Sequence, residues 1–189
     1  MNWSLKILLP VFIIVALAQW LVPAQMIWER EVILKKGKIY RFLTAPVDPN
    51  NPFIGKYITL NIKEGAARVD RTFPTKHDQP VYVLLTVDNA GFAKIKSVSL
   101  IEPSKEEAYV KAKVNWILNT DHEEPLANID YPFDEYYMEE HKAPKAELAY
   151  QQATRDSTSR TYVQVKIYKG NAVIEDVFIN DKPLTSYFK

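Results

Sequence analysis

The chain has 189 residues, a formal net charge of +1 and no cysteine. This length accommodates one folded domain plus an appendage, but not two ordinary domains. The net charge gives no general attraction to nucleic acid or to an acidic partner, and the lack of cysteine excludes a disulfide framework, a thiolate zinc site and a cysteine nucleophile.

An uncharged N-terminal segment predicts a membrane anchor over residues 1–28. No charged residue lies between Lys6 and Glu29. This span of about 22 residues, at about 1.5 Å each, matches the hydrocarbon core of a bilayer. A cleaved signal peptide is the alternative, with the Ala-Leu-Ala of residues 16–18 as its cleavage site. Because the apolar run continues to Trp28, we favour a retained single-pass helix.

The orientation of this anchor is less clearly encoded. Lys6 precedes the apolar segment, while Arg30, Lys35, Lys36 and Lys38 follow it. Basic residues at both ends prevent the positive-inside rule from deciding the topology. The signal-like N-terminus favours an extracytoplasmic, periplasmic location for the domain of residues 29–189.

The rest of the chain is predicted to be mainly β. Strand-like alternation and turn residues predict three hairpins, at 31–34 with 38–43, at 80–87 with 92–100, and at 161–168 with 172–179, and further strands at 56–62 and 109–118. Good helix formers after Pro144 predict one soluble helix over residues 145–155. Several hairpins with one helix indicate a compact antiparallel sandwich or a partly open barrel.

Two of these strands have a clear core face. In the strand at 56–62, the core residues are expected to be Ile58, Leu60 and Ile62. In the strand at 109–118, the half-buried face is expected to carry Val110, Ala112, Val114 and Trp116.

A proline-rich loop precedes the strand at 56–62, and residues 55–62 read Gly-Lys-Tyr-Ile-Thr-Leu-Asn-Ile. This stretch resembles the motif of the GDYXXLXY family of bacterial membrane-anchored proteins, with Lys56 in place of the Asp and Ile62 in place of the final Tyr. Asn50 or Ile54 stands where the family often has Arg. The residues of this chain that match the family motif and its lead-in are Pro46, Asp48, Pro49, Phe53, Gly55, Tyr57 and Leu60.

The resemblance extends over nearly the whole chain. It continues through the Tyr-Tyr-Met-Glu-Glu of residues 136–140, the helix that contains Glu147 and the last hairpin. The family has no known function, and some of its members look linked or fused to polytopic membrane proteins. The resemblance therefore implies a membrane-associated accessory domain, located in the bacterial inner membrane, and not a known reaction.

No catalytic or metal-binding constellation is predicted. Asp48 is interpreted as a turn residue and Tyr57 as a packed strand tyrosine. The acidic region of residues 121–140 lacks the spacing of a calcium loop, and the three histidines lie far apart in the sequence. No cofactor, metal or catalytic residue is expected.

The alternative to a non-enzymatic role is a signal-peptidase-like serine–lysine hydrolase or a small-ligand-binding β domain. Serines at positions 97, 99 and 104 lie near lysines at 94, 96 and 105. Neighbouring strand positions point to opposite faces, so this proximity does not indicate a dyad.

Our preferred hypothesis is an accessory domain that is anchored in the lipid bilayer by its N-terminal helix. It would bind or stabilise a polytopic membrane protein. Exposed aromatic residues are frequent at such contacts. The candidate partner surface consists of Tyr131, Phe133, Tyr136, Tyr137 and Glu139. Burial of these rings in the core is the alternative.

Overall fold

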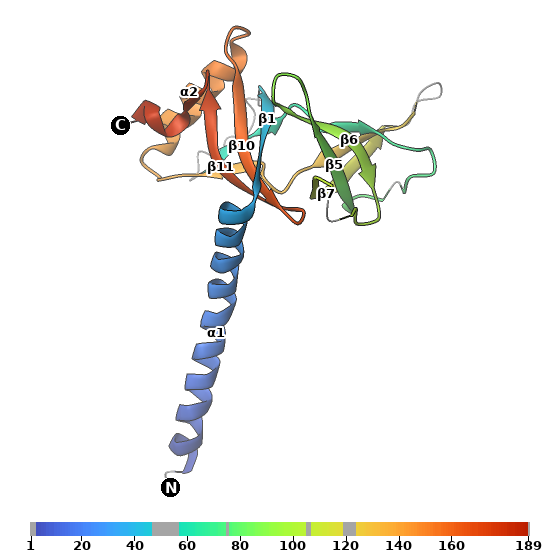
Figure 1. The fold of residues 1–189 in the computed structure, drawn as a ribbon. Coiled ribbons are helices and arrows are strands. Elements are labelled where there is room, and N and C mark those ends of the chain that lie inside the picture. Colours follow the sequence, from blue (N-terminus) through green and yellow to red (C-terminus); the bar gives the residue numbers. More distant parts are fainter. Residues whose placement is uncertain (1–2, 47–56, 75, 105–106, 119–123, 189) are drawn as a thin grey trace.

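The computed structural model describes residues 3–46, 57–74, 76–104, 107–118 and 124–188. Within these residues, a long N-terminal helix leads into two five-stranded sheets and one two-stranded sheet. All the strand pairs in the sheets are antiparallel. Figure 1 shows the helix extending away from the β-rich part of the molecule. The predicted fold class is confirmed: a mainly β domain with one helix of its own follows an apolar helix.

Helix α1 (Trp3–Lys36) has 34 residues. Its segment Ile7–Lys36 has a mean hydropathy of 2.3 in its most apolar window, and none of that window is buried against the domain. A helix of this length, at about 1.5 Å per residue, exceeds the thickness of a hydrocarbon core by several turns. The structure therefore contains one helix, among the described residues, that is long and apolar enough to cross a bilayer.

The predicted strand at residues 31–34 is wrong, because α1 continues through it to Lys36. An ion pair between Lys35 and Glu31 at 3.2 Å supports this last part of the helix. The helix ends at Gly37, whose N–H donates to the carbonyl of Ile33 at 2.7 Å. A Cβ at position 37 would lie 2.5 Å from that carbonyl oxygen and 3.0 Å from the Cβ of Lys166. Gly37 therefore permits the close approach of the helix end to the sheet.

The first sheet has the strand order β12-β11-β10-β1-β3. Its strands are β12 (Lys182–Pro183), β11 (Asn171–Ile179), β10 (Thr161–Tyr168), β1 (Lys38–Ala45) and β3 (Asn61–Ile62). Lys166 of β10 fastens α1 to this sheet, since its ammonium donates to the carbonyl of Leu34 at 2.8 Å and pairs with Glu175 at 3.0 Å. Carbonyls in the last turn of a helix lack partners within the helix, and Lys166 supplies one.

The second sheet has the strand order β4-β8-β7-β5-β6. Its strands are β4 (Ala66–Arg68), β8 (Leu126–Asp130), β7 (Tyr109–Leu118), β5 (Gln79–Val87) and β6 (Ala93–Ser99). The two-stranded sheet pairs β2 (Tyr57–Thr59) with β9 (Glu135–Tyr137). Helix α2 (Ala143–Arg155) and the 3-10 helix η1 (Leu184–Phe188) complete the domain. The predicted helix at 145–155 is thus confirmed, with Pro144 in its first turn.

The predicted strand at 56–62 is divided at Leu60 into two strands that pair with different partners. Strand β2 pairs with β9, whereas β3 pairs with β1. The predicted core face is confirmed, since Ile58, Leu60 and Ile62 are 1%, 3% and 9% exposed. This short segment therefore joins the small sheet to the first large sheet while it keeps its apolar side chains in the core.

Trp116 is half exposed, which corrects its predicted place on the buried face of β7. A β-bulge lies between Val114 and Trp116 in the pairing with β8. An extra residue in one strand reverses the faces of the side chains that follow it. Ile117 consequently packs against the core, while Val110, Ala112 and Val114 are buried as predicted.

One hydrophobic core joins the two large sheets. It contains Phe42 of β1, Val163 of β10, Val83 of β5 and Val110 of β7, all fully buried. A backbone hydrogen bond from Lys111 to the carbonyl of Gly170 (2.8 Å) ties β7 to the turn between β10 and β11.

Replacing Gly170 with alanine is expected to destabilise the domain by about 1–3 kcal/mol, because it combines backbone strain with a steric clash. Gly170 has a φ of +77°, and an added Cβ would lie 2.4 Å from the buried ring of Tyr109. Gly91 is a matched control, since it has a φ of +84° but nothing within 4 Å of an added Cβ. Denaturant unfolding of both variants separates the two effects. Equal destabilisation by G170A and G91A would show that the clash has no energetic consequence.

Candidate functional site

The strand that carries the sequence motif lies directly beside the strand that carries the tyrosine pair. In the β2–β9 ladder, Tyr57 lies opposite Tyr137, Ile58 opposite Tyr136 and Thr59 opposite Glu135. The N–H of Leu60 extends the contact by donating to the carbonyl of Asp134 at 2.6 Å. Two segments separated by the whole second sheet in the sequence are therefore adjacent in space.

The outer face of this ladder presents aromatic rings to solvent. The rings of Tyr57 and Tyr137 have centroids 5.5 Å apart at 50°, a tilted arrangement typical of cross-strand aromatic pairs. Tyr137 is 65% exposed. Its hydroxyl donates to the carboxylate of Glu135, and this hydrogen bond raises the pKa of Tyr137. We refer to Tyr57, Thr59, Glu135 and Tyr137 as the outer ladder face.

The inner face of the ladder belongs to the core. Ile58 is 1% exposed, and Tyr136 opposite it is half buried. The hydroxyl of Tyr136 donates to Asp176 of β11 at 3.0 Å. Burial, together with the neighbouring Asp176 carboxylate, raises the pKa of Tyr136 above that of a free tyrosine. Tyr136 thus positions the ladder against the first sheet and contributes little to the surface.

Two residues of the predicted partner surface lie in the core instead, which corrects that prediction. Tyr131 is 4% exposed and Phe133 is 3% exposed. Their rings stack on each other at 5.0 Å, and both contact the ring of Phe42. The hydroxyl of Tyr131 donates to the carbonyl of Glu64 at 2.9 Å, so its polar atom is satisfied inside the domain. These aromatic residues fill the space where the two large sheets meet.

Glu139, the last residue of the predicted surface, is exposed but lies beyond the ladder. Its carboxylate pairs with Lys142 at 3.0 Å and with His141 at 3.1 Å. The hydrogen bond from Lys142 is the main reason that the pKa of Glu139 is lowered. Exposed pairs of this kind contribute little to stability. Of the predicted surface, Tyr137 and Glu139 are therefore exposed, and Tyr136 is half buried.

Most of the proline-rich loop lies outside the described residues. Asp48, Pro49, Phe53 and Gly55 lie outside the described residues. Pro46 is described, and its carbonyl accepts a hydrogen bond from the side chain of Asn61 at 2.9 Å. This contact fixes the start of the loop beside the motif strand.

A hollow of about 430 Å³ adjoins the outer ladder face and reaches the anchor helix. Arg30 of α1 lines it together with residues 132–137 and 172–174. The sequence does not predict this position of Arg30, because no pattern in it relates Arg30 to residues more than a hundred positions away. The structure therefore brings Tyr136 and Tyr137 beside the part of α1 that directly follows its uncharged span.

The serine–lysine arrangement does not form among the described residues. The ammonium of Lys94 pairs with Glu64, and that of Lys96 lies 3.9 Å from Glu107. The hydroxyl of Ser99 donates to the carbonyl of Ile101 at 2.8 Å. Lys105 lies outside the described residues. Within the described ranges, the structure also holds no group of three histidine or acidic side chains arranged to bind a metal ion.

Comparisons with known proteins identify one similarity. The model of a family described as GDYXXLXY protein matches residues 19–177. This match includes the second half of α1, both strands of the ladder and most of the last hairpin. No curated protein and no solved structure matches the chain.

Proposed function

Because the chain belongs to the GDYXXLXY protein family, whose function is unknown, we propose that it is a membrane-anchored accessory domain that binds and stabilises a polytopic membrane protein. In this proposal the domain is periplasmic, α1 is its single anchor in the bacterial inner membrane, and the domain has no catalytic activity of its own. The outer ladder face is the contact surface, with Tyr137 at its centre.

The exposure of Tyr137 is the observation that carries this proposal. A ring that is 65% exposed, in a ladder otherwise packed onto the core, leaves a large apolar surface in water. Tyrosine is enriched among the residues that dominate the energy of protein interfaces, because it offers a large rigid surface and one hydroxyl. The hydrogen bond to Glu135 and the contact with Tyr57 hold the ring in one orientation.

The position of the surface supports a partner in the same membrane. The hollow beside the ladder is shared with Arg30, which follows the uncharged span of α1 by two residues. A loop or helix end of a partner that emerges from the bilayer next to α1 would lie within reach of this hollow. Arg30, Asp134 and Glu135 line it with both signs of charge, so a partner with polar and aromatic residues fits better than a purely apolar one.

Substitution of Tyr137 by alanine is expected to abolish recovery of the partner without unfolding the domain. Loss of a central interface tyrosine weakens binding by about 2 kcal/mol or more, which is roughly thirtyfold. Because the ring is mostly exposed, the effect on folding stability stays within about 1 kcal/mol. The measurement is affinity purification of the full-length protein from membranes in mild detergent, with quantification of co-purified membrane proteins by mass spectrometry.

Leu148→Ala is the matched control for this experiment. Leu148 is 60% exposed on α2, and Figure 1 shows α2 at the end of the domain away from α1. A polytopic protein recovered with the wild type and with L148A, but not with Y137A, supports the proposal. Equal recovery with both variants, or no polytopic protein with the wild type, contradicts it.

The periplasmic orientation has a separate test, since the chain contains no cysteine. A single cysteine placed at Leu148 is expected to react with a membrane-impermeant maleimide in spheroplasts. Reaction only after the membrane is broken would place the domain in the cytoplasm and overturn this part of the proposal.

A further inference from the structure

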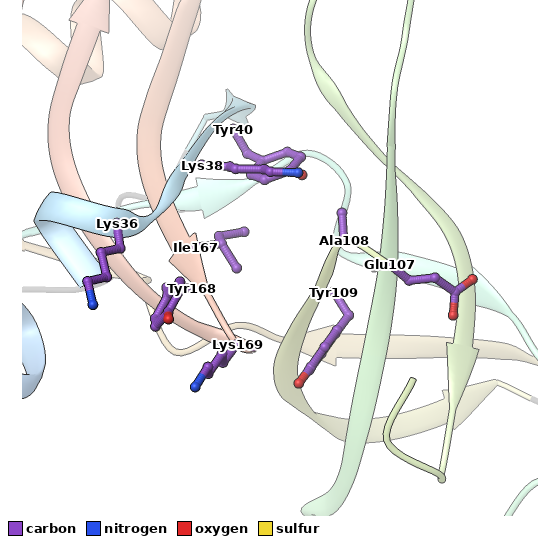
Figure 2. Close-up of a pocket in the computed structure, with 10 residues that line it drawn as sticks. Lys36, Lys38, Tyr40, Glu107, Ala108, Tyr109, Ile167, Tyr168 and Lys169 are labelled. Carbon is purple, nitrogen blue, oxygen red and sulfur yellow. The ribbon is translucent and has the colours of Figure 1, made fainter. Parts of the chain in front are cut away.

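A second hollow, of about 260 Å³, lies where the two large sheets meet the end of α1. Figure 2 shows that its walls come from the end of α1, the start of β1, the turn between β10 and β11, and the start of β7. It is separate from the hollow beside Tyr137, because the two share no lining residue. We call it the basic pocket, after Lys36, Lys38 and Lys169, which line it.

These three lysines have no acidic partner among the described residues. Lys36 is the last residue of α1, Lys38 the first of β1, and Lys169 lies in the β10–β11 turn. The one acidic residue described as lining the pocket is Glu107. Its carboxylate points away from the pocket in Figure 2 and lies 3.9 Å from Lys96. The pocket therefore concentrates positive charge that the domain itself does not neutralise.

Three tyrosines, Tyr40, Tyr109 and Tyr168, also line the pocket. Tyr109 is 7% exposed, and its hydroxyl donates to Glu102 at 2.7 Å. The ammonium of Lys169 lies 5.3 Å from the centre of the Tyr168 ring, a cation–π contact. The hydrogen bond between Lys111 and Gly170 joins the two walls at the base of the turn. The hollow is thus formed by packed and hydrogen-bonded residues, and it needs no ligand to open it.

The pocket lies close to the level of the membrane surface. Lys36 follows Trp28, the last residue of the uncharged span, by two helical turns, a rise of about 12 Å at about 1.5 Å per residue. The headgroup layer adds roughly 5–8 Å to each side of the hydrocarbon core, and a lysine side chain extends several ångströms further. Figure 1 shows the β10–β11 turn on the side of the domain from which α1 departs. The lysines can therefore meet a lipid headgroup.

We propose that the basic pocket binds the phosphate of an anionic lipid headgroup. Lysine binds phosphate as a point charge with three donors on a flexible stem. The ammonium groups of the three lysines lie apart in Figure 2, and their long side chains can turn toward one phosphate. An anionic bilayer surface also attracts nearby lysines. The bound headgroup would fix the domain at a set height and rotation above the membrane. This role is independent of the partner contact at Tyr137.

The test uses the full-length protein in a phosphorus-free detergent, titrated with phosphatidylglycerol or phosphatidylcholine and followed by native mass spectrometry. The wild type is expected to bind phosphatidylglycerol about tenfold more tightly than phosphatidylcholine. The triple variant K36Q/K38Q/K169Q is expected to lose this preference. The triple variant K36R/K38R/K169R keeps the charge and is expected to retain most of it.

A charge-matched control removes three exposed lysines elsewhere, as K113Q/K145Q/K182Q. If this control loses the preference as fully as K36Q/K38Q/K169Q does, general attraction explains the binding and the proposal is overturned. A wild type that binds both lipids equally also overturns it. Inorganic phosphate is the third probe. If it binds through the three lysines and competes with phosphatidylglycerol, recognition of the phosphate group is supported. If it binds through the three lysines while phosphatidylglycerol does not, the pocket belongs to a soluble phosphate compound and the proposal is overturned. Because the outer ladder face is unchanged in K36Q/K38Q/K169Q, this variant should still recover the membrane partner.

Discussion

Replacing Tyr150 with alanine is expected to lower the free energy of unfolding by about 3–5 kcal/mol, the usual effect of deleting a large aromatic side chain from a core. Tyr150 is the largest of the fully buried side chains among the described residues. The other buried residues of α2 are Ala143, Ala146 and Ala153. One ring therefore supplies most of the apolar surface by which α2 packs on the sheet, and its loss leaves a cavity.

A second variant, Tyr150→Phe, separates the effect of the hydroxyl from that of the ring. The hydroxyl is buried and has no hydrogen-bond partner among the described residues. Thr44 lies beside it and donates its own hydroxyl to that of Thr161 at 2.8 Å, but no hydrogen bond joins Tyr150 to Thr44 in the structure. A buried polar group without a partner is unfavourable. Tyr150→Phe is thus expected to be neutral or stabilising by up to about 1 kcal/mol.

Both variants can be measured by denaturant unfolding of the full-length protein in detergent micelles, followed by near-ultraviolet circular dichroism of the aromatic residues. Unequal effects, large for Y150A and small for Y150F, would confirm that the ring and not the hydroxyl holds α2 in place. A phenylalanine variant as unstable as the alanine variant would instead show that the hydroxyl is hydrogen-bonded in solution.

Local patterns in the sequence predict the strands that consist of long alternating or β-branched runs. Strands β5, β7, β10 and β11 all follow long runs of alternating or β-branched residues, and the structure has each within two residues of its predicted bounds. Helix α2 is similar, because Pro144 and the run of helix formers after it define its start.

Tertiary context decides the elements that the sequence does not predict. Strands β4, β8 and β9 have five residues or fewer, and each is held by its neighbours. Residues 31–34 have a β-like sequence, but they continue a helix already formed by the apolar segment before them, and adding a turn to an existing helix needs no new nucleus. The bulge that turns Trp116 outward likewise depends on the pairing of β7 with β8.

The same division applies to the candidate site. The resemblance to the family singles out Tyr57 and Tyr137 separately, but only the β2–β9 pairing brings their rings together. Tyr131 and Phe133 show the converse, since a run rich in aromatic residues contains both core and surface positions and the sequence does not separate them. The basic pocket combines residues from positions 36 to 170, which no local pattern relates.

A second large effect is expected in alkaline solution, where the domain should lose stability between about pH 10 and pH 12. Burial is the main cause that raises the pKa of Tyr109 and of Tyr150 to about 12, with the hydrogen bond to Glu102 adding to the effect at Tyr109. Burial also raises the pKa of Tyr131 and Tyr136. The folded state therefore keeps these phenols neutral at a pH where the unfolded chain has begun to ionise them.

The sign of the effect follows from the protons that each state binds. Below about pH 10 both states hold the phenolic protons, and the stabilisation of the neutral form is fully present. Between the unfolded and folded pKa values, the unfolded chain binds fewer protons, so the free energy of unfolding falls by about 1.4 kcal/mol per pH unit for each such tyrosine. Over two pH units, Tyr109 and Tyr150 together account for a loss of about 5 kcal/mol.

The double variant Tyr109→Phe/Tyr150→Phe isolates this contribution from the titration of the lysines, which is common to both proteins. Its free energy of unfolding should fall less steeply than that of the wild type across the same pH range, by about 3 kcal/mol per pH unit. Denaturant unfolding at a series of pH values gives the two slopes, and tyrosinate absorbance shows whether ionisation accompanies unfolding. Parallel slopes for the two proteins would mean that these phenols ionise without loss of the fold. The packing of Tyr109 against Gly170 and of α2 against the sheet would then be loose enough to admit water.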